Sequence, residues 1–414
     1  MNKAITILII SYFFVINTVF AQEIGLLIGV RHGGNYDTTA QLSNEEGPIE
    51  EKTEEMAPGA ADYRTVLFRI SENQEMDLEA EKTSLLVPRE DGFWRIDVKH
   101  SVYNDFTEDF IWVNPAPDPD MPPNPFLTNK LGIDAFDVVL LLKEQGIDVR
   151  QGEYCIGHTS RDILFVGTDH LSVGMISSET CRGTGASTGD SRLKLLTIDD
   201  LEPVEFSELL ADDAQKTFMN TAQKYQEQHQ SSGSEQWGEV SGGIVRAAGH
   251  WQVKGHFPGP KNYYTNFEVP IALPETLNEA QPLELDWQTI TDQVPEAVDA
   301  LMSPDKRILV VLTPSSLLGF SVNDGQLSQA PIGYYVLKQP LSVVMVRWSE
   351  GQYVNNWSQE IASLGPQPEK RWLKAGKIEA PKTAAENSFK LFGVVLPDNQ
   401  ATTLNIRADL GEHT

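Results

Sequence analysis

The stretch Ile163-Leu164-Phe165-Val166-Gly167-Thr168 recurs as Ile308-Leu309-Val310-Val311-Leu312-Thr313, and a second short strand pattern follows each copy. Ser84–Trp94 and Ser342–Tyr353 also resemble each other, because each has an apolar run followed by a glycine two residues before an aromatic residue. Such a pattern is typical of β-hairpins. Repeated hairpins predict an antiparallel and propeller-like architecture, and chance similarity of short apolar segments is the alternative explanation.

Strand patterns dominate the rest of the chain. They are short runs rich in Val, Ile, Leu, Phe and Tyr, bounded by Gly, Pro, Asp or Asn. The segments are 24–30, 65–71, 83–87, 92–99, 162–167, 170–177, 192–197, 242–246, 249–256, 265–272, 307–313, 317–322, 333–338, 341–348 and 388–396. We therefore predict a mainly β fold, with an α+β fold as the alternative.

Two inserted or flanking helices are predicted from apolar residues that recur every three or four positions. They cover residues 206–228 and 287–302. Pro295 is expected to kink or split the second helix, because proline has no backbone N–H and its ring clashes with the preceding turn. The segment 135–146 is compatible with either a helix or a strand.

Residues 249–256 alternate between two sets of side chains, which predicts a strand with one buried face. Trp251 belongs to the apolar set and is expected to be buried. The polar set is expected to face solvent and consists of His250, Gln252, Lys254 and His256. His250 and His256 would lie roughly 20 Å apart by strand rise, too far to share a metal ion.

The N-terminus predicts export. A positive start at Met1–Lys3 precedes the apolar run Ile5–Val19, and Val19-Phe20-Ala21 offers small residues for cleavage before Gln22. This is the pattern of a secretory signal peptide, with an apolar core too short to serve as a membrane anchor. We expect a periplasmic or extracellular protein that is not inserted in the membrane after cleavage.

The sequence suggests two halves after the signal peptide of residues 1–21. The N-terminal β-rich half covers residues 22–229 and ends in a helix, and the C-terminal β-rich half covers residues 236–414. Between them, residues 230–235 are rich in serine and read as a flexible join.

The chain is strongly acidic, with a formal net charge of −27, and loss of Lys3 with the signal peptide makes it one charge more negative. Such a charge repels phosphate backbones and anionic headgroups, which argues against nucleic-acid partners. The two cysteines, Cys155 and Cys181, flank a predicted hairpin, and in an exported protein this pair predicts one disulfide. Two buried thiols are the alternative.

A strand that ends in Arg31-His32-Gly33 resembles the nucleophile motif of the histidine phosphatase superfamily. The resemblance implies that His32 takes the phosphoryl group and Arg31 binds its oxygens. The sequence departs from that family at Gly34-Asn35, where many members carry another arginine. The candidates for a second histidine motif, Gly157-His158 and Gly249-His250, have no adjacent acidic residue.

Other catalytic and metal-binding patterns are weaker. Asp118, Asp120 and Asn124, and separately Asp199-Asp200, offer oxygens that suit calcium, but neither spacing matches a calcium loop, so we predict no metal or other cofactor. Nucleophile elbows, zinc-protease motifs and phosphate loops are not found in the sequence.

We therefore expect an exported, non-catalytic protein that binds a surface, a protein or a glycan outside the cytoplasm. The first alternative is an exported phosphohydrolase that uses Arg31-His32-Gly33. The second is a glycan-active enzyme or lectin, suggested by the eight tryptophans.

Overall fold

The computed structural model describes residues 23–34, 60–103, 106–116, 154–182, 187–229, 239–258, 264–274, 277 and 283–376. Several sequence predictions lie outside these residues. They concern the signal peptide, the calcium candidates at 118–124, the segment 135–146, the join at 230–235 and the strand at 388–396.

The described strands form four sheets, in which all neighbouring strands are antiparallel except β6 and β7. Sheet A has the order β19-β1-β2-β3, with β1 (Ile24–His32), β2 (Asp62–Ile70), β3 (Met76–Lys82) and β19 (Ser342–Glu350). Sheet B runs from β10 (Pro203–Val204) to β4 in reverse chain order, through β9 (Ser187–Thr197), β8 (His170–Arg182), β7 (Tyr154–Val166), β6 (Phe106–Pro115), β5 (Gly92–Tyr103) and β4 (Leu85–Arg89).

The smaller sheets come from the C-terminal half of the chain. Sheet C consists of β11 (Ser241–Ala247), β12 (His250–Pro258) and β13 (Tyr264–Glu268). Sheet D contains β14 (Asp299–Met302), β15 (Ile308–Leu312), β16 (Ser316–Asn323), β17 (Gln326–Leu327), β18 (Gly333–Leu337) and β20 (Leu373–Ala375). The described helices are the short 3-10 helix η3 (Phe206–Leu209), α2 (Asp212–His229), α3 (Trp287–Gln293) and α4 (Gln352–Ser363).

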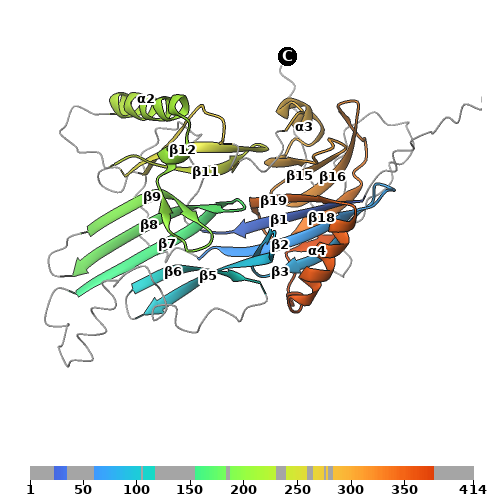
Figure 1. Cartoon of the computed structure of the whole chain (residues 1–414), viewed down its shortest axis with the longest axis horizontal. Helices are drawn as coiled ribbons and strands as arrows, with labels where there is room; N and C mark the ends of the chain where they lie inside the picture. Colours follow the sequence, from blue (N-terminus) through green and yellow to red (C-terminus); the bar gives the residue numbers. More distant parts are fainter. Residues whose placement is uncertain are drawn as a thin grey trace, which may run out of the picture.

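Sheet A lies at the centre of the molecule, between sheets B and D (Figure 1). Its strand β1 is buried along its whole length except at His32. Leu26 and Ile28 pack against sheet D, whereas Leu27 packs against sheet B. Because both faces are covered, β1 shows a continuous apolar run instead of an alternating pattern. Gly29 permits this close packing, since a Cβ there would lie 2.9 Å from Cβ of Met345.

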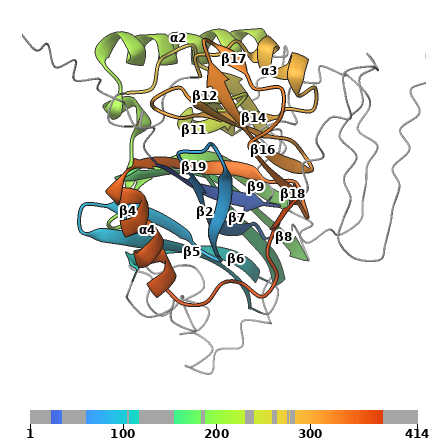
Figure 2. The same ribbon diagram turned by 90° about the vertical axis from the view of Figure 1, so that its right-hand side faces the viewer.

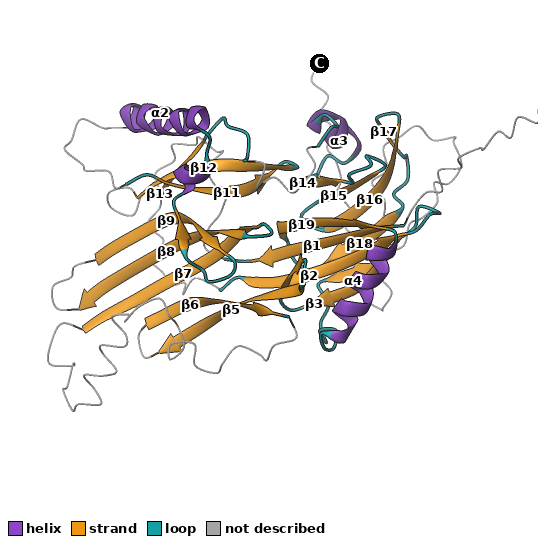
Figure 3. Ribbon diagram, viewed as in Figure 1, coloured by secondary structure: helices purple, strands orange, loops and turns teal. Residues whose placement is uncertain are grey.

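The helices cover the outside of the sheets (Figure 3). Helix α2 places Phe218 and Ala222 in the core that it shares with sheet C, and this core also includes Phe165 and Leu195 of sheet B. Helix α3 contributes Ile290 to the core on the outer face of sheet D. The cores are therefore stacked in layers between sheets and helices.

The prediction of a mainly β fold is confirmed, whereas the propeller-like form is not confirmed, because the sheets stack face to face. Both segments belong to the first strand of an antiparallel hairpin: Ile163–Val166 ends β7 in the β7–β8 hairpin, and Ile308–Leu312 is the whole of β15 in the β15–β16 hairpin. The second pair of similar segments differs. Gly92 begins strand β5, but Gly351 precedes helix α4, which buries Val354 and Ile361.

The two predicted helices have different outcomes. The segment 206–228 forms η3 followed by α2, so the predicted helical region is confirmed, but it is two helices separated at Leu210 and not one. The prediction for 287–302 is wrong in its second half, since α3 ends at Gln293 and Asp299–Met302 is strand β14. Pro295 cannot continue the helix, and the following residues pair with β15 instead.

The alternation in β12 is only partly confirmed. His250 is exposed and Trp251 is half-buried against the ring of Phe165, at 4.8 Å between ring centroids. The prediction that His256 faces solvent is wrong, because its side chain is fully buried. Its Nδ1 lies 2.7 Å from Oδ1 of Asn266 and its Nε2 lies 2.7 Å from Oγ of Ser191. Strand β9, which packs on β12, covers the face that the sequence pattern assigns to water.

The two sequence halves share sheet A. Strand β19 belongs to the C-terminal half and pairs along its length with β1, from Ile24 opposite Glu350 to Arg31 opposite Ser342. Strand β1 therefore receives its two hydrogen-bonded neighbours, β2 and β19, from opposite ends of the described chain.

Candidate functional site

Arg31 and His32 leave strand β1 on opposite faces, as consecutive strand residues do. Arg31 is buried and faces sheet B, where its Nη1 lies 3.9 Å from Oδ2 of Asp162. His32 faces the other way and packs edge-on against Trp372. The structure therefore does not bring together the two side chains that the phosphatase resemblance assigns to one phosphate.

The Asp162 carboxylate lies beside the C-terminal end of β1, next to Arg31 and Gly34. Gly34 has a φ of 98°, which favours glycine, and a Cβ at Gly34 would lie 2.5 Å from Oδ1 of Asp162. The Tyr63 hydroxyl accepts a hydrogen bond of 2.8 Å from the backbone N–H of Ile163. Burial, reinforced by the Asp162 charge, raises the pKa of Tyr63 far above its usual range, so the phenol stays protonated. This arrangement packs Arg31 as part of the interior.

The His32 ring is held by structural contacts. Its Nδ1 lies 3.0 Å from the carbonyl oxygen of Pro340. Because a carbonyl only accepts hydrogen bonds, Nδ1 carries the proton and donates. The contact fixes the ring between β1 and the start of β19.

A second group of polar side chains lies on three neighbouring strands of sheet B. Asp109 of β6 accepts from His100 of β5, with 2.7 Å between Nδ1 and Oδ1, and its Oδ2 accepts from the backbone N–H of Arg161 at 3.1 Å. His158 of β7 lies 2.5 Å from Oγ1 of Thr107 through its Nδ1. Asp109 is buried and fully engaged in these contacts, so the group reads as a structural network.

This network gives the protein a pH-dependent element. Burial lowers the pKa of His158 from its usual value; the Asp109 charge opposes this shift, and the nearby His100 adds to it. The folded state binds a proton at His158 less well than the unfolded state does. The contribution of His158 to the free energy of unfolding is therefore fully present above the pKa that His158 has in the unfolded chain. It is lost as the pH falls through the lowered folded pKa.

We expect His158→Gln to reduce the drop in melting temperature between pH 7.5 and pH 5, because the variant has no imidazole to protonate. Thermal unfolding of both proteins at the two pH values measures this. Equal drops in the two proteins would show that His158 carries no such linkage.

Asp199 and Asp200 are engaged in local contacts. Asp199 forms an ion pair with Arg89. Asp200 accepts hydrogen bonds from the Thr197 hydroxyl and from the backbone N–H of Glu202, and these bonds lower the pKa of Asp200. Across the described ranges, no group of three or more His, Cys, Asp or Glu residues could hold a metal ion.

The cysteine pair lies at the outer end of the β7–β8 hairpin. The backbone register places Cys155 directly opposite Cys181, but their side chains lie outside the described residues. Directly opposite residues of antiparallel strands have Cα atoms about 4.5–5.5 Å apart, within the range that a disulfide spans. The disulfide stays a prediction, and the backbone register is compatible with it.

If Cys155 and Cys181 are bonded, denatured and unreduced mature protein should show no free thiol. The bond would close a loop of about 25 residues and contribute on the order of 3 kcal/mol to the free energy of unfolding. Labelling with a maleimide and intact mass measurement tests this. Incorporation of two labels would contradict the prediction.

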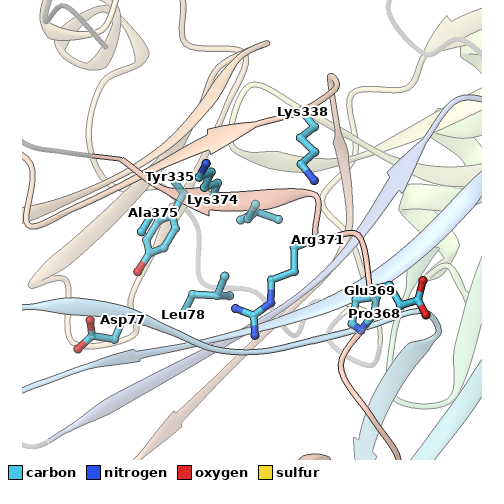
Figure 4. A pocket seen from close by; sticks show the side chains of 10 residues that line it. Asp77, Leu78, Tyr335, Lys338, Pro368, Glu369, Arg371, Lys374 and Ala375 are labelled. Atoms are coloured by element: carbon cyan, nitrogen blue, oxygen red, sulfur yellow. The ribbon is translucent and has the colours of Figure 1, made fainter. Parts of the chain in front are cut away.

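A pocket of about 560 Å³ lies where β3, β18 and β20 meet. Residues 364–376, which we call the strap, form one wall. In Figure 2 the strap leaves the lower end of α4 and rises to β18. The lining residues are Asp77, Leu78, Tyr335, Lys338, Pro368, Glu369, Arg371, Leu373, Lys374 and Ala375. Figure 4 shows Arg371 between Asp77 and Glu369, whose carboxylates lie at opposite sides of the view.

The strap is anchored to sheet A through Glu81. This side chain is completely buried, forms an ion pair with Arg64 and accepts from the backbone N–H of Trp372 at 2.7 Å. The Arg64 guanidinium lies over the Trp372 ring, 4.2 Å from its centroid. Arg64 Nη1 also donates to the carbonyl oxygen of Lys370 at 2.6 Å. The wall of the pocket is therefore fixed by buried contacts.

Tyr335 lies at the bottom of the pocket, and its phenol is protonated and neutral. Its hydroxyl donates to the carbonyl oxygen of Met76 at 2.7 Å. Burial, together with the Asp77 charge, raises the pKa of Tyr335 to about 12. A phenol of this pKa serves as a hydrogen-bonding group and not as a base at neutral pH.

Neither a comparison with models of known protein families nor a comparison with curated proteins finds a match for this chain. None of the helices in the described part of the chain is long and apolar enough to cross a membrane.

Proposed function

We propose that this chain is an exported, non-catalytic protein whose pocket beside β20 binds a protein or glycan ligand outside the cytoplasm. The observation that carries the proposal is the rim of the pocket. Lys338, Arg371 and Lys374 are exposed there, and their side chains make no ion pair or hydrogen bond with any described residue. Elsewhere in the described chain, Arg31, Arg64 and Arg69 each have a carboxylate partner.

Three features support binding over catalysis. The wall of the pocket is fixed through Glu81, and a preformed site loses less conformational entropy when a ligand binds. The charged side chains of the rim are long and exposed, which suits contact with a ligand. The geometry at Arg31 and His32 supports structural roles for both residues, since each is held on a different face of β1.

Filling the pocket tests the proposal. Ala375 is exposed and lines the pocket, and Ala362 is exposed on α4 and serves as the matched control. We expect mature protein and Ala362→Trp to bind the same ligands on a glycan array, and Ala375→Trp to lose them. Equal binding by both variants would show that the ligands bind outside the pocket.

An activity assay separates this proposal from the phosphohydrolase alternative. Mature protein is incubated with an aryl phosphate at acidic pH, beside His32→Ala. We expect no turnover by either protein. Hydrolysis by the parent that His32→Ala abolishes would overturn the proposal.

A further inference from the structure

We propose that the pocket beside β20 recognises an acidic glycan, through carboxylate or sulfate groups held by Lys338, Arg371 and Lys374. This inference rests on the proposed function, since it names the ligand class for the same pocket. The lining contains these three cations against the two carboxylates of Asp77 and Glu369. The pocket is thus a positive region on a chain whose net charge is −27.

The fold holds two of these cations close together. Strands β18 and β20 pair antiparallel with Val336 opposite Lys374, and the backbone N–H of Lys338 donates to the carbonyl oxygen of Trp372 at 3.0 Å. Lys338 follows directly after the last residue of β18, so its backbone lies about 7–8 Å from that of Lys374. Like charges on one strand pair repel, and an anion bound between them removes that cost.

Arg371 adds a planar donor group on the strap. A guanidinium binds a carboxylate or sulfate through two parallel hydrogen bonds. Its nearest charged neighbours on the strap are Lys370, another exposed cation without a side-chain partner among the described residues, and Glu369. Figure 4 shows the Lys338 amine directed toward the strap that carries Arg371.

The remaining lining favours a sugar over other anions. Asp77 and Glu369 can accept hydrogen bonds from the hydroxyl groups of a sugar. Leu78 and Pro368 supply apolar surface for the faces of sugar rings. An anionic membrane is disfavoured, because anionic headgroups repel a chain whose net charge is −27.

The experiment compares polymers that share one backbone. Binding of mature protein to dextran, carboxymethyl-dextran and dextran sulfate is measured by biolayer interferometry at low and physiological salt. We expect both charged polymers to bind at least roughly tenfold more tightly than dextran, as charge-assisted hydrogen bonds of about 1.5–3 kcal/mol each would give. We expect Lys338→Glu and Arg371→Glu each to weaken the charged polymers by a similar factor.

Lys224→Glu is the matched control, because Lys224 is exposed on α2, away from the pocket. It should change binding less than twofold. Equal binding to dextran and to the charged polymers, lost in Ala375→Trp, would overturn the anionic ligand but leave the pocket as a binding site. Binding to phosphatidylglycerol vesicles in preference to the polymers would overturn the assignment of a glycan as the ligand. Absence of binding to all probes would overturn the inference, while loss of array ligands in Ala375→Trp would still support the proposed function.

Discussion

Glu81→Ala should lower the free energy of unfolding by about 3–5 kcal/mol, the usual cost of breaking a buried ion pair on one side. The substitution leaves the Arg64 guanidinium and the Trp372 N–H without the carboxylate that they share. Urea denaturation followed by tryptophan fluorescence measures the change. The same substitution should also weaken ligand binding at the pocket, because it releases the strap.

Asp77→Ala is the control on the same strand. Asp77 is exposed on β3, so its removal should alter the free energy of unfolding by no more than about 0.5 kcal/mol. Hydrogen exchange then separates a local effect from a global one. We expect faster exchange at Trp372 and its neighbours in Glu81→Ala and unchanged exchange in Asp77→Ala. A loss below about 1 kcal/mol in Glu81→Ala would show that the strap is held by other contacts.

Phe68→Ala should be equally damaging, at about 3–5 kcal/mol, because it removes a large side chain from a closed core. Phe68 is fully buried on β2, between sheets A and D, and its ring meets that of Tyr335 edge-on at 5.0 Å between centroids. The variant leaves a cavity between two sheets that are both anchored elsewhere, so the site cannot collapse to fill it.

Tyr353→Ala provides the contrast for Phe68→Ala. Tyr353 is 68% exposed on α4, and we expect its loss to change the free energy of unfolding by no more than about 0.5 kcal/mol. Both variants are compared by calorimetry in the same buffer. Similar melting temperatures for the two variants would place Phe68 in a region that unfolds before the rest of the protein.

The strands that the sequence predicts are those with apolar side chains on at least one face. Strand β1 is found because its apolar run is uninterrupted. Strand β3 is missed, because Met76–Lys82 carries Asp77, Glu79 and Glu81, and such a pattern reads as a solvated loop. Its acidic residues are stabilised by cations on β2, since Arg69 pairs with Glu79. Strand β3 is therefore stabilised by partners on another strand, which a local sequence pattern does not reveal.

The sequence of helix α4 contains a helical periodicity, although its first residues resemble a hairpin. Val354, Trp357 and Ile361 recur at three- and four-residue spacing, which predicts a helix with one apolar face. The resemblance of Gly351–Tyr353 to Gly92–Trp94 suggested a strand instead. Three residues were too few to distinguish these outcomes, whereas the periodicity over Gln352–Ser363 was sufficient.

The candidate pocket could not be predicted from the sequence, because its walls come from β3, β18 and the strap, which are far apart in the chain. One local signal was available. Lys370, Arg371 and Lys374 form a cationic run in an otherwise acidic protein. The tripeptide Arg31-His32-Gly33 resembles a catalytic motif, but the period of two in a strand places its first two side chains on opposite faces.

The pairing of β1 with β19 has a consequence for how the protein reaches its native state. The first described strand finds one of its two neighbours only near the other end of the described chain, at Ser342–Glu350. Closing so long a loop costs entropy before any contact repays it, so we expect slow folding dominated by non-local contacts. During synthesis, the centre of the sheet stack stays incomplete until β19 has emerged from the ribosome. A chain with this order of assembly remains unfolded for longer than one whose paired strands are neighbours in the sequence.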